Sequence, residues 1–225
     1  MTFQATPERG RFITFEGGEG VGKSTQLKRL ADHLRDCGFE VVTTREPGGT
    51  PKAERLRDFL LSGRAAPLGP LAEAALFSAA RADHVEKLIA PALKRGAWVL
   101  CDRFADSTSA YQGARGGVDA KTLALLERAT VGETRPDLTI VLDLPAQEGL
   151  ARAALRREGG ETADRFERED SSFHEELRQV FLAIAEDEPE RCCVIDAARS
   201  VDDVASAVRA VVHDRFLAQA AQAAQ

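Results

Sequence analysis

One stretch near the amino terminus, residues 17–25, restricts what this chain can fold into more than any other. Gly17 to Ser24 matches the pattern G-x-x-x-x-G-K-[ST], in which glycines let consecutive backbone N–H groups turn inward around an anion. Lys23 is placed to contact the β- and γ-phosphates of a nucleotide, and the Ser24 hydroxyl to contact Mg²⁺. The nucleotide-binding residues predicted here are Gly17, Gly18, Glu19, Gly20, Val21, Gly22, Lys23, Ser24 and Thr25.

The residues on both sides of this loop support a phosphate-binding role. Residues 11–15 are mostly β-branched and aromatic, which predicts a short buried strand. After Ser24, apolar residues recur at helical spacing through residue 34, so a helix would direct the positive end of its dipole at the phosphates. The alternative is a glycine-rich turn that contains a lysine by chance. Such a turn would not require a strand before it and a helix after it.

Composition limits the class of protein further. The chain has 225 residues, 44 % of them hydrophobic, which suits one domain with a sizeable core. Its net charge of −6 gives no basic footprint for nucleic acid, and no apolar run is long enough for a membrane span or a signal peptide. The four cysteines form neither a C-x-x-C pair nor a metal cluster, which favours a reducing compartment. We therefore predict a cytoplasmic protein that binds neither nucleic acid nor membrane.

Apolar runs and helical patterns alternate along the chain. The runs predicted as strands are residues 11–15, 39–44, 97–101, 138–142 and 192–195. The predicted helices are residues 51–61, 71–94, 104–112, 119–130, 147–157, 172–186 and 201–216, besides the one after the loop. This alternation predicts an α/β protein of the P-loop NTPase fold, a five-stranded parallel sheet with helices on both faces. We expect a single domain over residues 1–225 with loose termini at 1–9 and 217–225.

Polar residues follow the predicted strands at the sheet edge where open α/β proteins bind ligands. In residues 44–50, Pro47 and two glycines predict a tight loop with Arg45 at its base, where a guanidinium can grip a phosphate. An ordinary turn beside a surface arginine is the alternative. Asp102 and Arg103 follow the 97–101 strand and suggest an acid for Mg²⁺ and a cation for a phosphoryl group, with a strand-end salt bridge as the alternative.

Two predicted helices carry groups that suit a sugar or a base. Ser107, Tyr111 and Gln112 fall near one helical face, although a packed polar helix has the same pattern. Phe77 and Arg81 are four residues apart and share a face, with a ring to stack on a base and a guanidinium to bond its edge. A core phenylalanine beside a surface arginine is the alternative for this second pair.

The segment of about residues 152–168 is rich in arginine and predicts a lid. Its arginines are Arg152, Arg156, Arg157, Arg165 and Arg168. A mobile loop that delivers arginine to a transferring γ-phosphoryl group is a recurrent solution, whereas a solvated charged face is the alternative for any one of these residues. Phosphoryl transfer of this kind depends on positioning and electrostatics, so we assign no histidine to catalysis.

Together these stretches resemble the thymidylate kinase family, whose members phosphorylate dTMP with ATP. The matching stretches are residues 15–25, 44–50, 77–81, 102–113, 135–138 and 164–167. The interior of the phosphate-binding loop lacks arginine, so the sequence resembles the bacterial arrangement in which the lid supplies it. The resemblance implies transfer of the γ-phosphoryl group of ATP, with Mg²⁺, to dTMP, giving dTDP for dTTP biosynthesis. It also implies a homodimer packed through helices, for which the helix over 71–94 is one candidate.

The resemblance implies roles for the residues around the phosphates. Glu19 is expected to contact the sugar 3′-hydroxyl, and Arg45 and Arg103 the phosphate of dTMP. Arg165 would anchor the lid or the adenine side. The predicted catalytic residues are Lys23, Asp102, Arg103, Arg152 and Arg156, and the predicted Mg²⁺ contacts are Ser24 and Asp102.

The resemblance also implies how the nucleoside is read. Phe77 would stack on thymine, and Arg81 would donate to its 4-oxo group. Tyr111 would crowd a ribose 2′-hydroxyl and so favour deoxynucleotides, while Ser107 and Gln112 would make polar contacts near the base.

Two other functions share part of this pattern. A kinase for dUMP or a deoxynucleoside would keep the phosphate-binding loop, but Arg45 and Arg103 favour an acceptor that already carries phosphate. A nucleotide-binding regulatory module without turnover would also keep it, but Lys23, Ser24 and Asp102 favour catalysis. The sequence contains no Asn-Lys-x-Asp guanine-reading motif that would indicate a GTPase switch.

Overall fold

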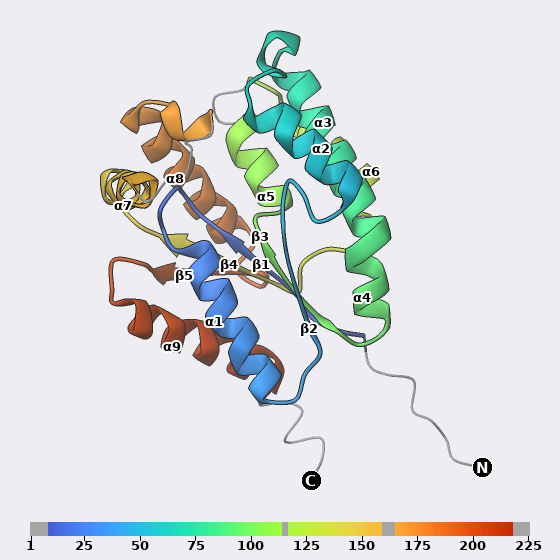
Figure 1. The fold of residues 1–225 in the computed structure, drawn as a ribbon, viewed down its shortest axis with the longest axis vertical. Coiled ribbons are helices and arrows are strands. Elements are labelled where there is room, and N and C mark those ends of the chain that lie inside the picture. Colours follow the sequence, from blue (N-terminus) through green and yellow to red (C-terminus); the bar gives the residue numbers. More distant parts are fainter. Residues whose placement is uncertain (1–8, 114–116, 159–164, 218–225) are drawn as a thin grey trace, which may run out of the picture.

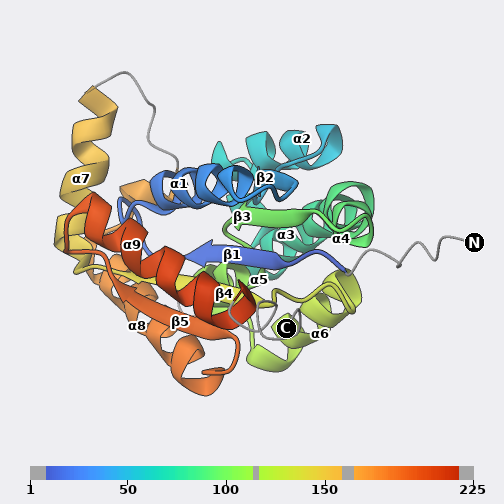
Figure 2. The same ribbon diagram turned by 90° about the horizontal axis from the view of Figure 1, so that it is seen from below.

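A computed structural model of the chain describes residues 9–113, 117–158 and 165–217. Within these residues the strands are β1 (Phe12–Glu16), β2 (Val41–Arg45), β3 (Trp98–Asp102), β4 (Leu138–Asp143) and β5 (Cys192–Asp196). They pair in parallel in the order β2-β3-β1-β4-β5, and β1 lies in the middle of the sheet (Figure 2). The predicted α/β fold with a five-stranded parallel sheet is confirmed.

Helices connect the strands of this sheet. In the described part of the chain they are α1 (Lys23–Asp36), α2 (Pro51–Leu61), α3 (Pro70–His84), α4 (Ala90–Lys94), α5 (Ala105–Thr108), α6 (Ala120–Val131), α7 (Ala146–Glu158), α8 (Ser171–Asp187) and α9 (Val201–Val212). The side chains of Thr50, Asp119, Asp170 and Ser200 cap the amino ends of α2, α6, α8 and α9 by accepting a backbone N–H. The helix predicted over 51–61 is confirmed at both ends.

The long helix predicted over residues 71–94 is interrupted, which corrects that prediction. α3 ends at His84, and a π-helical turn, Val85–Ile89, leads into α4. Pro91 accounts for the wider turn, because proline has no N–H to donate to the carbonyl four residues earlier and its ring crowds that carbonyl. A π-helical turn also extends α5 over Ser109–Gly113.

Apolar side chains cover both faces of the sheet. On one face α1 and α9 lie side by side (Figure 1). Their leucines and valines pack onto β1, β3 and β4. On the other face Phe12 and Val99 pack against residues of α4 and the start of α5, and Phe181 of α8 packs against Val141. Each fully buried phenylalanine or leucine stabilises the fold by roughly 1.5–3 kcal/mol.

The strand register explains why distant polar residues meet. β3 lies between β1 and β2, so Asp102 pairs with Phe15 on one side and Arg45 on the other. The phosphate-binding loop after β1, the loop after β2 and Arg103 after β3 are thereby brought to one edge of the sheet. The described helices include none that is long and apolar enough to cross a bilayer.

Candidate active site

A cleft of about 470 Å³ lies at the carboxyl ends of β1, β2 and β3. Its walls come from the loop before α1, the start of α1, the loop after β2, the helices α2, α3 and α5, and the pair Phe166 and Glu167. The predicted site residues that line it are Glu19, Gly20, Gly22, Lys23, Ser24, Thr25, Arg45, Phe77, Arg81, Asp102, Arg103, Ser107, Tyr111 and Gln112. The fold therefore gathers most of the residues that the motifs predicted into one cavity.

The loop between β1 and α1 closes around Lys23. Its Nζ donates to the carbonyl oxygens of Gly17 at 3.1 Å and Gly18 at 2.6 Å. Gly20 is required for this path, because its φ is +69° and a Cβ there would lie 1.9 Å from the carbonyl oxygen of Gly149. Burial, and then the charge of Arg103, lower the pKa of Lys23 to about 8. A polyphosphate beside Lys23 would therefore stabilise its charged form.

Ser24 and Asp102 meet at the start of α1. The Ser24 hydroxyl donates to Oδ2 of Asp102. A hydroxyl and a carboxylate suit Mg²⁺, which accepts few protein ligands and takes its other positions from water and phosphate oxygens. Residues 9–113, 117–158 and 165–217 hold no cluster of three or more His, Cys, Asp or Glu side chains fit for a metal. The donor set therefore fits a metal that arrives with a nucleotide.

Arg103 is held inside the cleft by Glu19. Its Nη2 donates to Oε1 of Glu19 at 2.5 Å and its Nη1 to the carbonyl of Gly17 at 3.1 Å. The hydroxyl of Tyr111 donates to the same Glu19 oxygen at 2.7 Å, and the guanidinium lies 5.2 Å from the centre of the Tyr111 ring. In the described chain Arg103 is the one residue other than glycine with positive φ, +67°. This strained conformation turns Arg103 back toward the phosphate-binding loop.

Glu19 is charged at neutral pH in this arrangement. Burial alone would raise the pKa of its carboxyl, but the charges of Arg103 and Lys23 and the bond from Tyr111 lower it to about 2. The same pairing raises the pKa of Arg103 against the opposing effect of burial. The Glu19 carboxylate therefore accepts hydrogen bonds from both Arg103 and Tyr111 and holds them in place.

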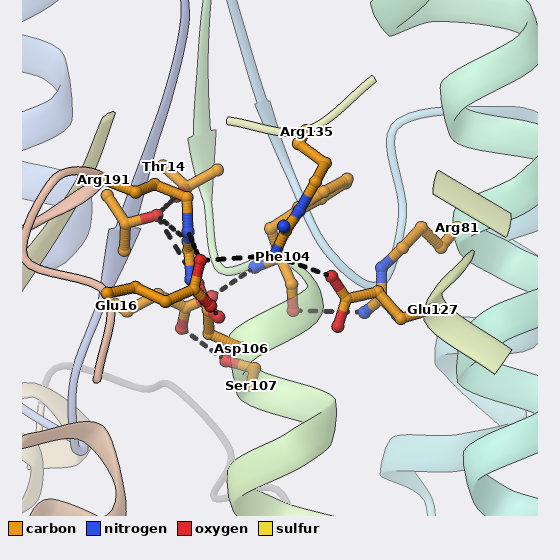
Figure 3. A network of polar contacts seen from close by, with 11 residues as sticks. Thr14, Glu16, Arg81, Phe104, Asp106, Ser107, Glu127, Arg135 and Arg191 are labelled. Carbon is orange, nitrogen blue, oxygen red and sulfur yellow. Dashed lines mark hydrogen bonds and ion pairs between the residues drawn. The ribbon is translucent and has the colours of Figure 1, made fainter. Parts of the chain in front are cut away.

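A buried polar network beneath the cleft fixes the first turn of α5 (Figure 3). Oε1 of Glu16 accepts from the N–H of Phe104 at 2.7 Å, and Oε2 accepts from the Ser107 hydroxyl at 2.6 Å. Burial, and then the charge of Asp106, raise the pKa of Glu16 to about 7. Asp106 is held by two hydrogen bonds, 2.8 and 2.9 Å long, from Arg191. The two carboxylates thus tie α5 to β1 and to the residue before β5.

One wall of the cleft is formed by α3. Arg81 is only 3 % exposed, so it is not the surface arginine of the alternative interpretation. Its Nε donates to Oε2 of Glu46 at 2.8 Å, and its Nη2 donates to the carbonyl of Phe104 at 3.1 Å and the hydroxyl of Thr108 at 2.8 Å. Phe77 lines the cleft one helical turn before Arg81. The pair therefore faces the cavity together.

The remaining predicted arginines lie in different places. Arg45 is more than half exposed at the cleft and donates to Glu54 at 3.1 Å. Arg152 of α7 donates to the carbonyl of Ala197, just after β5, at 3.0 Å and does not line this cavity. The side chain of Arg156 and residues 159–164 lie outside the described residues. Delivery of arginine by the lid therefore stays a prediction.

Arg165 connects the carboxyl end of the predicted lid to α3. It forms a two-bond ion pair with Glu73, in which Nη2 lies 2.9 Å from Oε2, and its guanidinium lies 4.5 Å from the centre of the Phe166 ring. Phe166 and Glu167 line the cleft. This ion pair supports the predicted anchoring role of Arg165.

Comparison with known proteins decides the family. The profile described as thymidylate kinase matches residues 15–208. The thymidylate kinase of Bradyrhizobium diazoefficiens is 56 % identical over 214 residues, covering 95 % of this chain and 93 % of its own. That of Afipia carboxidovorans is 58 % identical over 194 residues, covering 86 % and 85 %. The crystal structure of thymidylate kinase from Ehrlichia chaffeensis matches with a TM-score of 0.73 and 34 % identity, covering 91 % of this chain and 99 % of that one.

The chain belongs to the thymidylate kinase family. The resemblance inferred from the motifs is confirmed, and it extends over most of the chain.

Some of the residues that line the cleft were not predicted from the sequence motifs. The lining residues that were not predicted as site residues are Glu46, Pro47, Arg57, Leu61, Phe104, Thr108, Phe166 and Glu167. Phe166 and Glu167 stand in one of the stretches that resemble the family, so that stretch was a usable signal. Arg57 and Leu61 gave none, because their spacing on α2 is that of any amphipathic helix. Arg57 donates to the carbonyl of Pro47 at 2.8 Å and so also supports the loop after β2.

Proposed function

We propose that the cleft carries the family's reaction, with ATP on the phosphate-binding loop and the phosphate of dTMP at Arg103. As a member of this family, the protein is a kinase that transfers the γ-phosphoryl group of ATP to dTMP, giving dTDP for dTTP synthesis. The observation that carries the site assignment is that Lys23, the Ser24–Asp102 pair and Arg103 share one cavity. Phosphoryl transfer needs donor and acceptor phosphates neutralised and aligned in such a place.

The acceptor phosphate is proposed to lie between Arg45 and Arg103. The register places these residues beside and just after Asp102, so two guanidiniums border the same point. The charged carboxylate of Glu19 would accept a hydrogen bond from the sugar 3′-hydroxyl. Tyr111, whose hydroxyl is already bonded to Glu19, would border the 2′ position and exclude a hydroxyl there.

The base is proposed to lie along α3 and α5. Phe77 supplies an aromatic face and Arg81 a donor for the 4-oxo group, since both line the cavity. Gln112 is buried on the α5 side, and Ser107, which bonds to Glu16, lines the cavity beside it. Both are assigned polar contacts near the base.

Mg²⁺ is proposed to accompany ATP. Ser24 and Asp102 would hold it, and when bound it neutralises charge on the β- and γ-phosphates. Arg152 and Arg156 are proposed to serve the γ-phosphoryl group. Support comes from α7, which carries both residues and touches the phosphate-binding loop where Gly149 meets Gly20.

The protein is further proposed to act in the cytoplasm as a homodimer that packs through α3 and α6. These two helices contact each other, and each presents a leucine to solvent, Leu71 at 56 % and Leu125 at 58 % exposure. All four cysteines are free thiols, which suits a reducing compartment. Sedimentation equilibrium of the whole chain tests the dimer, and a monomer at micromolar concentration would contradict it.

Titration calorimetry with dTMP and with thymidine tests the phosphate site. Arg103→Met should weaken dTMP binding by roughly 10- to 100-fold, the value of lost charge-assisted hydrogen bonds, and should change thymidine binding far less. Arg35→Met is the control, since Arg35 is an exposed residue of α1 that bonds to Asp32. Equal losses for the two ligands in Arg103→Met would place the acceptor phosphate elsewhere.

A further inference from the structure

A buried chain of hydrogen bonds joins the loop after β2 to α3, and the proposed mechanism does not use it. Glu46 lies between two residues of α3: its Oε2 accepts from Nε of Arg81 at 2.8 Å, and its Oε1 accepts from Nδ1 of His84 at 3.0 Å. Nε2 of His84 lies 2.8 Å from the hydroxyl of Thr44. The side chains of Arg81, Glu46 and His84 are 3 %, 4 % and 0 % exposed. The chain of contacts therefore runs Thr44–His84–Glu46–Arg81 within the interior.

These partners occupy both ring nitrogens of His84. The Glu46 carboxylate only accepts, so Nδ1 carries the proton toward it, and Nε2 shares a hydrogen bond with the Thr44 hydroxyl. The loop backbone closes over the ring: a Cβ on Gly49 would lie 2.4 Å from Nε2 of His84. Because it is enclosed in this way, His84 does not line the cleft, and its connection to Arg81 runs through Glu46.

Arg81 has one end of its guanidinium left for a ligand. Nε is taken by Glu46, and Nη2 is taken by the carbonyl of Phe104 and the hydroxyl of Thr108. Nη1 makes no hydrogen bond to any residue that the structure describes, while Arg81 lines the cleft. A guanidinium is a rigid planar fork, so holding Nε and Nη2 also sets the direction of Nη1.

We propose that His84 and Glu46 are positioning residues that set base specificity by holding Nη1 of Arg81 as a fixed donor. This rests on the proposed function, in which Arg81 donates to the 4-oxo group. Thymine offers an acceptor at that point, whereas cytosine offers an amino group and would leave two donors facing each other. A rigid Arg81 cannot turn away from the clash, and a loosened one can. His84 and Glu46 therefore act on discrimination between bases.

Two substitutions separate the two bonds of His84. The amide of Asn reaches about where Nδ1 lies, so His84→Asn keeps a bond to Glu46. The amide of Gln reaches about where Nε2 lies, so His84→Gln keeps only the bond to Thr44. Thr44→Val is the matched control, because it removes the Thr44 bond and leaves Glu46 paired. The readout is the ratio of kcat/KM for dTMP to kcat/KM for dCMP.

We expect this ratio to fall by roughly tenfold or more in His84→Gln and to stay within about threefold of wild type in His84→Asn and Thr44→Val. The KM for ATP should be unchanged in all three variants, which separates positioning from general damage. Glu46→Gln weakens the bonds of residue 46 to Arg81 and to His84 without changing the side-chain volume. It should also lower the ratio, and it replaces His84→Gln in the test if that variant does not fold.

Two results would overturn the inference. One is a wild-type ratio in both His84→Gln and Glu46→Gln, and the other is an equal fall in His84→Asn, His84→Gln and Thr44→Val. A wild-type protein without any dTMP-dependent turnover would be a different failure, because it would remove the proposed function on which the inference rests.

Discussion

The buried carboxyl of Glu16 makes stability depend on pH in a way that one substitution removes. Burial, and then the charge of Asp106, raise its pKa from 4.5 to about 7 in the folded protein. Between these values the folded chain holds a proton that the unfolded chain has released. The contribution of Glu16 to stability is therefore complete below pH 4.5 and is lost as the pH rises through about 7. At about 1.4 kcal/mol per pKa unit, the loss is on the order of 3 kcal/mol in the free energy of unfolding.

Urea unfolding of the wild type and of Glu16→Gln, at about pH 5 and about pH 8, measures this loss. Glutamine does not titrate, so the wild type should lose roughly 2–3 kcal/mol more than the variant between the two conditions. Thr14→Val is the control: Thr14 is on the same strand and bonds to Thr139 at 2.7 Å, yet it has no proton to release, so this variant should keep the wild-type pH dependence. Equal losses in the wild type and Glu16→Gln would refute the assignment of the titrating group.

Two predictions concern catalysis. Lys23→Ala should abolish ADP formation, because Lys23 contributes its charge to the phosphates, and should leave the urea midpoint close to that of the wild type. Full activity in this variant would contradict the proposed mechanism. Tyr111→Ala should narrow the preference for dUMP over UMP, because the ring no longer crowds a 2′-hydroxyl; an unchanged ratio of the two turnover rates would remove that role from Tyr111.

The sheet and the phosphate-binding loop could be predicted because both follow from patterns of residues that are close together in the sequence. A buried strand such as β1 is a short run of β-branched and aromatic residues, and the loop pattern ending at Ser24 follows it at once. The cap of α2 at Thr50, followed by Pro51, is equally local, and that helix has its predicted bounds.

The rest depends on contacts between residues far apart in the chain. The pairing of Asp102 with Arg45 requires the strand order, and the raised pKa of Glu16 requires Asp106 to be held nearby by Arg191, 85 residues further along the sequence. The contact of Arg152 with the residue after β5 could not be predicted either. Periodicity indicates which face of a helix is buried, but not which element packs against that face. Such features follow from packing, which no local pattern records.

Whether this chain phosphorylates dTMP is tested by measuring ADP release with ATP and Mg²⁺ over a panel of acceptors, namely dTMP, dUMP, UMP, dCMP, AMP and GMP. We expect strong stimulation by dTMP, with dUMP far behind and the other monophosphates near the rate without acceptor. ATP that binds and is not consumed faster with any of the six would contradict it, and would point to another acceptor or to a nucleotide-binding module without turnover.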